Sequence, residues 1–210
     1  MSHPTWSRFF APSFDPEGAA GPVAFPLLGL VGLTLLTVLV AAPLLPGAYA
    51  GQAPEILRGV RTSLWVLVAV SPILGLAKGL ALTGMAWSLL VLLGAEARFR
   101  ALLSVTLFGE LVLATQGLWI VGVLWLRGGG AGAGEGDLRV FTGLDIILDD
   151  PSSPLGVMAS AVTPFHVAWV LFLAWGFASL SRGGRARGAA AALLCWGLTA
   201  GTGVLRALAG

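Results

Sequence analysis

The stretch SPILGLAKGLALTGMAW, residues 71–87, places one lysine, Lys78, inside an apolar run that reaches from Thr62 to Gly94 and contains no other charge. Over the whole chain of 210 residues, 57% are hydrophobic and only 10% are charged. Soluble globular proteins are about half apolar and about a quarter charged, so the low share of charge excludes an ordinary soluble domain. The sequence predicts an integral membrane protein.

Apolar windows set the predicted topology. A bilayer core about 30 Å thick needs roughly 20 apolar helical residues for each crossing. Windows of this kind predict an all-α polytopic membrane protein with five transmembrane helices, at approximately 23–45, 62–94, 101–126, 155–180 and 189–208. We expect residues 1–22 to be an amphipathic N-terminal segment, residues 23–210 the membrane domain, and residues 127–154 an extramembrane loop. No segment alternates apolar with polar residues, so strands are not expected.

Two of these runs leave a boundary open. The run around Lys78 would be about 50 Å long as one straight helix, which exceeds the hydrocarbon thickness. Either it tilts strongly or it breaks near Pro72 and Gly75, because proline removes a backbone donor and glycine loosens the helical turn. In the fourth run, Thr163 and Pro164 are typical of an N-cap and a first helical position, which leaves the start of that helix undetermined.

Lys78 needs a partner if it lies within the bilayer. A lone ammonium at mid-bilayer costs at least ~2.5 to 3.5 kcal/mol, so the side chain should face the bundle and meet an acceptor. Counted from the hairpin between the second and third runs, Glu110 would lie roughly 9 Å from Lys78 along the axes of antiparallel neighbours. The sequence predicts an ion pair between them, supported by Gln116, Ser104 or Thr106 if these face inward.

Two interpretations of this pair remain open. It can be a structural bridge that fixes the register of two helices, as intramembrane polar groups do. Alternatively, Lys78 lies beside the Pro72 and Gly75 positions and belongs to a solute or proton path, because interrupted helices with midplane charges often mark transport sites.

Motifs of enzymes, metal sites and cofactor sites are missing from the sequence. There is no HExxH pair, no GxSxG elbow and no Walker glycine loop, and His3 and His166 are far apart. Asp145, Asp149 and Asp150 lack the spacing of a known calcium loop. We therefore expect no enzymatic activity, cofactor, metal or nucleic-acid partner. The expected partners are the lipid bilayer and another membrane protein or a second copy of the chain.

Arginines suggest the orientation. With five crossings, six arginines fall on the side of the N-terminus and five on the other side, and the segment SRGGRARG, residues 181–188, is basic and free of acids. Positive residues favour the cytoplasmic side. The sequence predicts a multi-pass protein of the bacterial inner membrane with its N-terminus in the cytoplasm.

Three stretches together resemble the Yip family of five-span membrane proteins, which is named for interaction with Ypt/Rab GTPases and has many bacterial members. They are LLGAEARFRALLSVTLFGELVLATQGLW (92–119), VTPFHVAWVLFLAWGFASLSR (162–182) and the opening WSRFFAPSFDPEG (6–18). In the second stretch, the positions similar to the family's fourth-span pattern are Phe165, Trp169 and Gly176, a candidate packing or partner motif.

This resemblance implies a Yip-like bundle with a cytosolic N-terminus. It also implies a non-enzymatic role as a partner-binding, scaffold or accessory subunit. Eukaryotic members of the family present a long cytosolic N-terminal region, whereas here the first apolar run starts at residue 23, so GTPase binding is not expected. The alternative function is a small-solute or ion transporter or channel subunit that uses Lys78 and Glu110.

Overall fold

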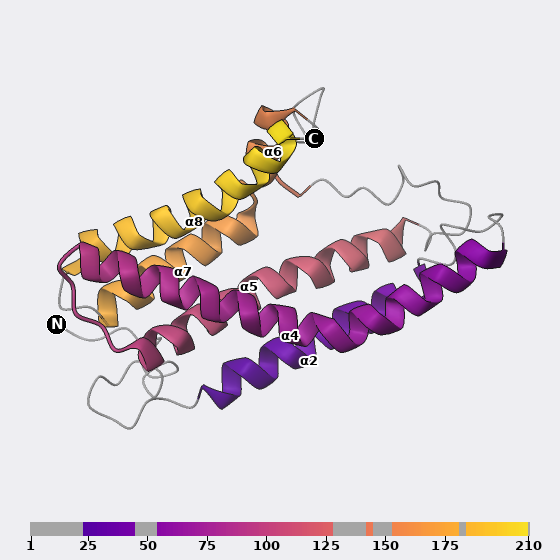
Figure 1. The fold of residues 1–210 in the computed structure, drawn as a ribbon, viewed down its shortest axis with the longest axis horizontal. Helices are drawn as coiled ribbons and strands as arrows, with labels where there is room; N and C mark the ends of the chain where they lie inside the picture. Colours follow the sequence, from indigo (N-terminus) through magenta and orange to yellow (C-terminus); the bar gives the residue numbers. More distant parts are fainter. Residues whose placement is uncertain (1–22, 45–53, 128–141, 145–152, 181–183, 210) are drawn as a thin grey trace.

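The computed structural model describes residues 23–44, 54–127, 142–144, 153–180 and 184–209, and the regular elements in these ranges are all helices. In chain order they are α2 (Ala24–Ala41), α4 (Pro54–Leu92), α5 (Phe99–Leu126), α6 (Pro154–Ser160), α7 (Pro164–Leu180) and α8 (Gly184–Ala209) (Figure 1). The predicted all-α class is confirmed for these ranges. The predicted N-terminal segment and most of the predicted loop 127–154 lie outside the described residues.

Three of the described helices are long and apolar enough to cross a membrane: α2, residues 68–92 of α4, and α5. They coincide with the first three predicted runs. The helix α7 is apolar but shorter, with 17 residues. The helix α8 begins at Gly184, five residues before the predicted fifth run, and includes Arg185 and Arg187 of the preceding basic segment.

The helix α4 is continuous through Pro72, which excludes a break near this residue, one of the two alternatives that the sequence left open. Apolar membrane helices tolerate proline where neighbouring groups satisfy the freed backbone carbonyl. With 39 residues, α4 is about 58 Å long at ~1.5 Å per residue. It begins before the predicted run because Pro54 suits a first helical position and Glu55 lies in the first turn, where a negative charge is favourable. Its N-terminal part projects beyond the ends of α2 and α5 (Figure 1).

The fourth predicted span, residues 155–180, is two helices rather than one, because α6 and α7 are separated at residues 161–163. The backbone N–H of His166 donates to Thr163 Oγ1 at 3.0 Å, which is the hydrogen bond of an N-cap. Pro164 follows as the first residue of α7. The predicted cap is thus confirmed, and the start of the fourth apolar helix, which the sequence left undetermined, lies at Pro164.

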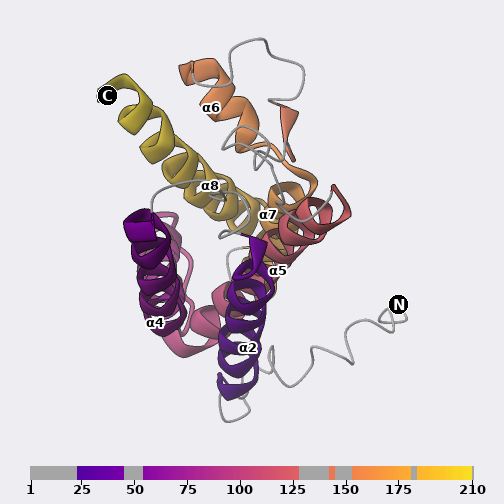
Figure 2. The same cartoon turned by 90° about the vertical axis from the view of Figure 1, so that its right-hand side faces the viewer.

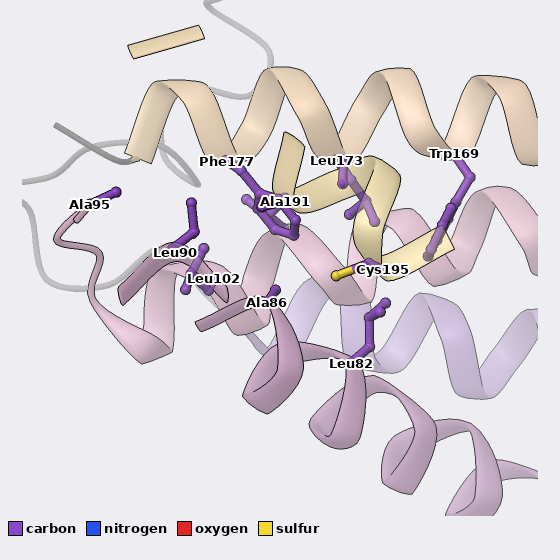
Figure 3. Close-up of a cluster of buried hydrophobic side chains, with 12 residues drawn as sticks. Leu82, Ala86, Leu90, Ala95, Leu102, Trp169, Leu173, Phe177, Ala191 and Cys195 are labelled. Carbon is purple, nitrogen blue, oxygen red and sulfur yellow. The ribbon is translucent and has the colours of Figure 1, made fainter. Parts of the chain in front are cut away.

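The core lies between α4, α5, α7 and α8. The helix α5 contacts α2, α4 and α7, and α7 packs most extensively against α8 (Figures 1 and 2). Gly188 allows the α7–α8 contact to be close, because a Cβ at this position would lie 2.5 Å from the backbone nitrogen of Ala178. Figure 3 shows the buried cluster that joins the four helices, with Leu82, Ala86, Leu90, Leu102, Trp169, Leu173, Phe177, Ala191 and Cys195 among its members.

Candidate polar site in the helix bundle

Lys78 on α4 and Glu110 on α5 meet inside this apolar bundle. Lys78 Nζ lies 2.7 Å from Glu110 Oε2. This distance is that of a charge-assisted hydrogen bond. The Glu110 side chain is only 5% exposed, whereas that of Lys78 is 54% exposed. The structure therefore brings together the two residues that the sequence paired, with the carboxylate inside the bundle and the ammonium at its edge.

The turn between α4 and α5 sets the register of this pair. Gly94 has φ +69, the left-handed conformation that commonly ends a helix. The N–H of Ala95 then donates to the carbonyl of Leu90 at 2.8 Å, and that of Gly94 to the carbonyl of Val91 at 2.9 Å. Because these bonds fix the end of α4 and the start of α5, they also fix which residues of the two helices lie at the same level.

A cavity of about 290 Å³ adjoins the ion pair. Its walls come from four helices, and it brings residues far apart in sequence to one place. They are Lys78, Ala81, Leu82 and Met85 of α4, Glu110 and Leu113 of α5, His166 and Trp169 of α7, and Leu198, Thr199 and Thr202 of α8.

Two buried polar atoms on residues of this cavity lack a hydrogen-bond partner among the described residues: Glu110 Oε1 and Trp169 Nε1. The indole ring of Trp169 packs against Gly109, the residue before Glu110, because a Cβ added to Gly109 would lie 3.2 Å from Trp169 Nε1. More than nine in ten buried polar groups in proteins make a hydrogen bond. The unpaired acceptor and the unpaired donor are therefore the groups of the cavity residues that most need a hydrogen-bond partner.

The remaining polar side chains of the cavity are held by local bonds. His166 Nδ1 and Thr163 Oγ1 are 2.9 Å apart, and His166 Nε2 makes no hydrogen bond with the described residues. Thr199 Oγ1 donates to the carbonyl of Trp196 at 2.8 Å, and Thr202 Oγ1 donates to the carbonyl of Thr199 at 2.7 Å. Each hydroxyl retains lone pairs that can accept a hydrogen bond.

The prediction that Gln116, Ser104 or Thr106 supports the Lys78–Glu110 ion pair is wrong. Gln116 Nε2 donates to Thr142 Oγ1 at 3.1 Å, Thr106 Oγ1 bonds Thr83 Oγ1 at 2.5 Å, and Ser104 Oγ is buried without a partner among the described residues. The reason is axial distance. Ser104 and Gln116 each lie six residues from Glu110, roughly 9 Å along α5, and Thr106 lies one turn away, level with a different residue of α4.

The three positions suggested by the family resemblance all lie on α7. Trp169 is buried and lines the cavity, Gly176 is buried, and Phe165 is partly buried. No group of three or more His, Cys, Asp or Glu side chains that could hold a metal occurs within the part of the chain that the structure describes. The three aspartates considered above, at 145, 149 and 150, lie outside that part.

Comparison of the chain with family models, with curated proteins and with solved structures finds no match. The resemblance to the Yip family therefore stays a prediction, and the function is argued below from the site itself.

Proposed function

We propose that this chain is an integral membrane protein with five transmembrane helices and without enzymatic activity, and that it binds a small solute beside Lys78 and Glu110, on a path across the membrane. One observation carries this proposal. A charged pair lines a largely apolar cavity between the helices, and one oxygen of its buried carboxylate has no hydrogen-bond partner among the described residues.

The packing of α7 and α8 supports five crossings. These two helices lie beside α5 and α4, and the buried cluster joins all four (Figure 3). With 17 and 26 residues, α7 and α8 are about 26 and 39 Å long, comparable to the hydrocarbon thickness of about 30 Å. If α5 and part of α4 cross the bilayer, the helices packed along them share the same slab of lipid.

The geometry favours a ligand site over a purely structural bridge. A bridge would enclose both partners, whereas the Lys78 side chain is 54% exposed. An ammonium facing acyl chains costs at least ~2.5 to 3.5 kcal/mol, so this side chain needs water, a solute or another protein next to it. Ionisable residues within membrane segments typically mark substrate or ion pathways.

The distribution of arginines supports a cytoplasmic N-terminus in a bacterial inner membrane. Arg98 lies at the α4–α5 turn, and Arg185 and Arg187 lie in the first turn of α8, at the same end of the bundle (Figure 1). Arg187 Nη1 donates to the carbonyl of Gly94 at 2.8 Å, which joins the two basic segments. In the proposed orientation, this end faces the cytoplasm.

A second candidate function is the Yip-like partner-binding or accessory subunit. The observation that favours it is the N-terminal arm of α4, residues 54–67, which precedes the apolar span 68–92 and projects beyond α2 and α5 (Figure 1). This arm exposes Arg58 and Trp65, and Trp65 is 71% exposed. Co-purification from mild detergent tests it: a stoichiometric partner that is lost on Trp65→Ala supports this candidate, and a chain that purifies alone argues against it.

The solute path is tested by the access of water to Thr199. In a Cys195→Ala background, we expect Thr199→Cys to react with a charged methanethiosulfonate reagent at least ten times faster than Leu194→Cys. Leu194 is also exposed on α8 but lines no described cavity, and a thiol in contact with lipid does not ionise. Equal, slow reaction of both variants in proteoliposomes would contradict the proposed function.

A further inference from the structure

We propose that the ligand of this cavity is a small zwitterion, an α-amino acid with a short apolar side chain. The inference rests on the proposed function and adds the chemical class of the solute. It follows from the hydrogen-bonding groups that remain free once the side chains of the cavity have made their bonds to one another, from the net charge of the site, and from its size.

The donors of the cavity fit a carboxylate. A lysine ammonium has three N–H donors, and one of them is directed to Glu110 Oε2, so Lys78 retains two. Trp169 contributes the buried indole N–H, which has no partner among the described residues. A carboxylate has about four lone-pair positions and accepts bonds from several donors at once. The ligand carboxylate is therefore assigned to the side of Lys78 and Trp169.

The acceptors of the cavity fit an ammonium. Glu110 Oε1 is buried without a partner among the described residues, and the hydroxyls of Thr199 and Thr202 use their hydrogens on backbone carbonyls. Together they offer an anionic oxygen and two neutral ones. An ammonium donates three hydrogen bonds, so its requirement matches these three acceptors.

Charge balance selects a zwitterion over a simple ion. Lys78 and Glu110 form a pair of zero net charge, so an anion or a cation alone would bring an unpaired charge between apolar helices. Such a charge is expensive in a medium of low dielectric constant. A zwitterion brings one charge of each sign, and each of its charges lies next to the opposite charge of the pair.

Size and polarity of the walls restrict the rest of the ligand. A volume of about 290 Å³ is at the lower end of the range of about 300 to 1,000 Å³ typical of ligand sites. The walls away from the pair are apolar and consist of Ala81, Leu82, Met85, Leu113 and Leu198. They favour a short aliphatic side chain over a polar or a bulky one.

Binding to the full-length protein in nanodiscs tests this class with L-valine and two analogues that each retain one charge. We expect saturable binding of valine, and binding at least tenfold weaker for isobutylamine, which lacks the carboxylate, and for isovalerate, which lacks the ammonium. Glu110→Gln should weaken the binding of valine at least tenfold. The control Glu55→Gln makes the same change at an exposed position on the α4 arm, outside the cavity, and should leave valine binding unchanged. Analogues that bind as tightly as valine would overturn the assignment.

In the same Cys195→Ala background, protection of Ala81→Cys, which lines the cavity but offers the ligand no polar side chain, separates the two proposals. If valine slows the modification of this cysteine at least tenfold, the ligand class is supported. If the cysteine reacts quickly and valine gives no protection, the zwitterion is wrong while a water-accessible solute path stands. If the cysteine does not react even without valine, the proposed function itself is wrong.

Discussion

Replacing Lys78 by methionine leaves the Glu110 carboxylate, which is only 5% exposed, without its cation. Removing one partner of a fully buried ion pair typically costs about 3 to 5 kcal/mol of unfolding free energy. Because Lys78 is 54% exposed, screening weakens this pair, and we expect Lys78→Met to cost about 2 to 3 kcal/mol.

Removing the charge of Glu110 instead of that of Lys78 has a smaller expected effect on the free energy of unfolding. In Glu110→Gln the remaining ammonium is half exposed and can extend towards water, so we expect a loss of about 1 kcal/mol. The double variant carries no charge at either position and should also lose only about 1 kcal/mol, which gives a coupling energy of about 2 to 3 kcal/mol.

The assay is reversible unfolding in mixed detergent micelles, followed by circular dichroism for the wild type, both single variants and the double variant. A coupling energy of about 2 to 3 kcal/mol would agree with an ion pair inside the bundle. Single-variant losses that add to within about 0.5 kcal/mol would refute the reasoning, because independent residues behave additively.

Two further changes test the packing and the capping of the helices. Gly188→Ala should lower the thermal stability sharply, because the new Cβ would lie 2.5 Å from the Ala178 backbone nitrogen. The control Gly197→Ala, at a position where a Cβ would meet nothing within 4 Å, should be neutral or slightly stabilising. Equal melting temperatures for the two variants would contradict the close α7–α8 contact. Thr163→Ala removes the acceptor of the His166 backbone N–H and should cost about 1 kcal/mol in the same unfolding assay, and Thr163→Ser should restore most of that loss.

Local patterns in the sequence predicted much of the fold because they report local physics. The apolar run beside Lys78 predicted a helix, and the Thr163–Pro164 pair predicted a helix start that the structure confirms. The course of α4 through Pro72 could not be predicted in the same way. Whether proline breaks a helix depends on neighbouring groups that satisfy the freed carbonyl, and these belong to tertiary structure.

The cavity was only half predictable. Lys78 and Glu110 stand out as isolated charges on neighbouring helices, so counting residues from the hairpin was enough to pair them. Thr199 and Thr202 were missed because α8 reaches the site only through its packing against α7 and α4, which a single sequence does not reveal. Their spacing of three residues in an apolar helix was the available signal, since such residues share one helix face.

The side of the membrane reached by the α7–α8 turn tests the central claim most directly, because the cavity lies within the bilayer only if both helices cross it. In a Cys195→Ala background, single cysteines at Glu96, Gly132 and Ala186 can be labelled in intact cells with an impermeant maleimide. Five crossings predict that Gly132→Cys is labelled from outside, while Glu96→Cys and Ala186→Cys are both protected until the membrane is opened. Labelling of Ala186→Cys together with Gly132→Cys would mean that α7 does not cross the bilayer and would contradict the account.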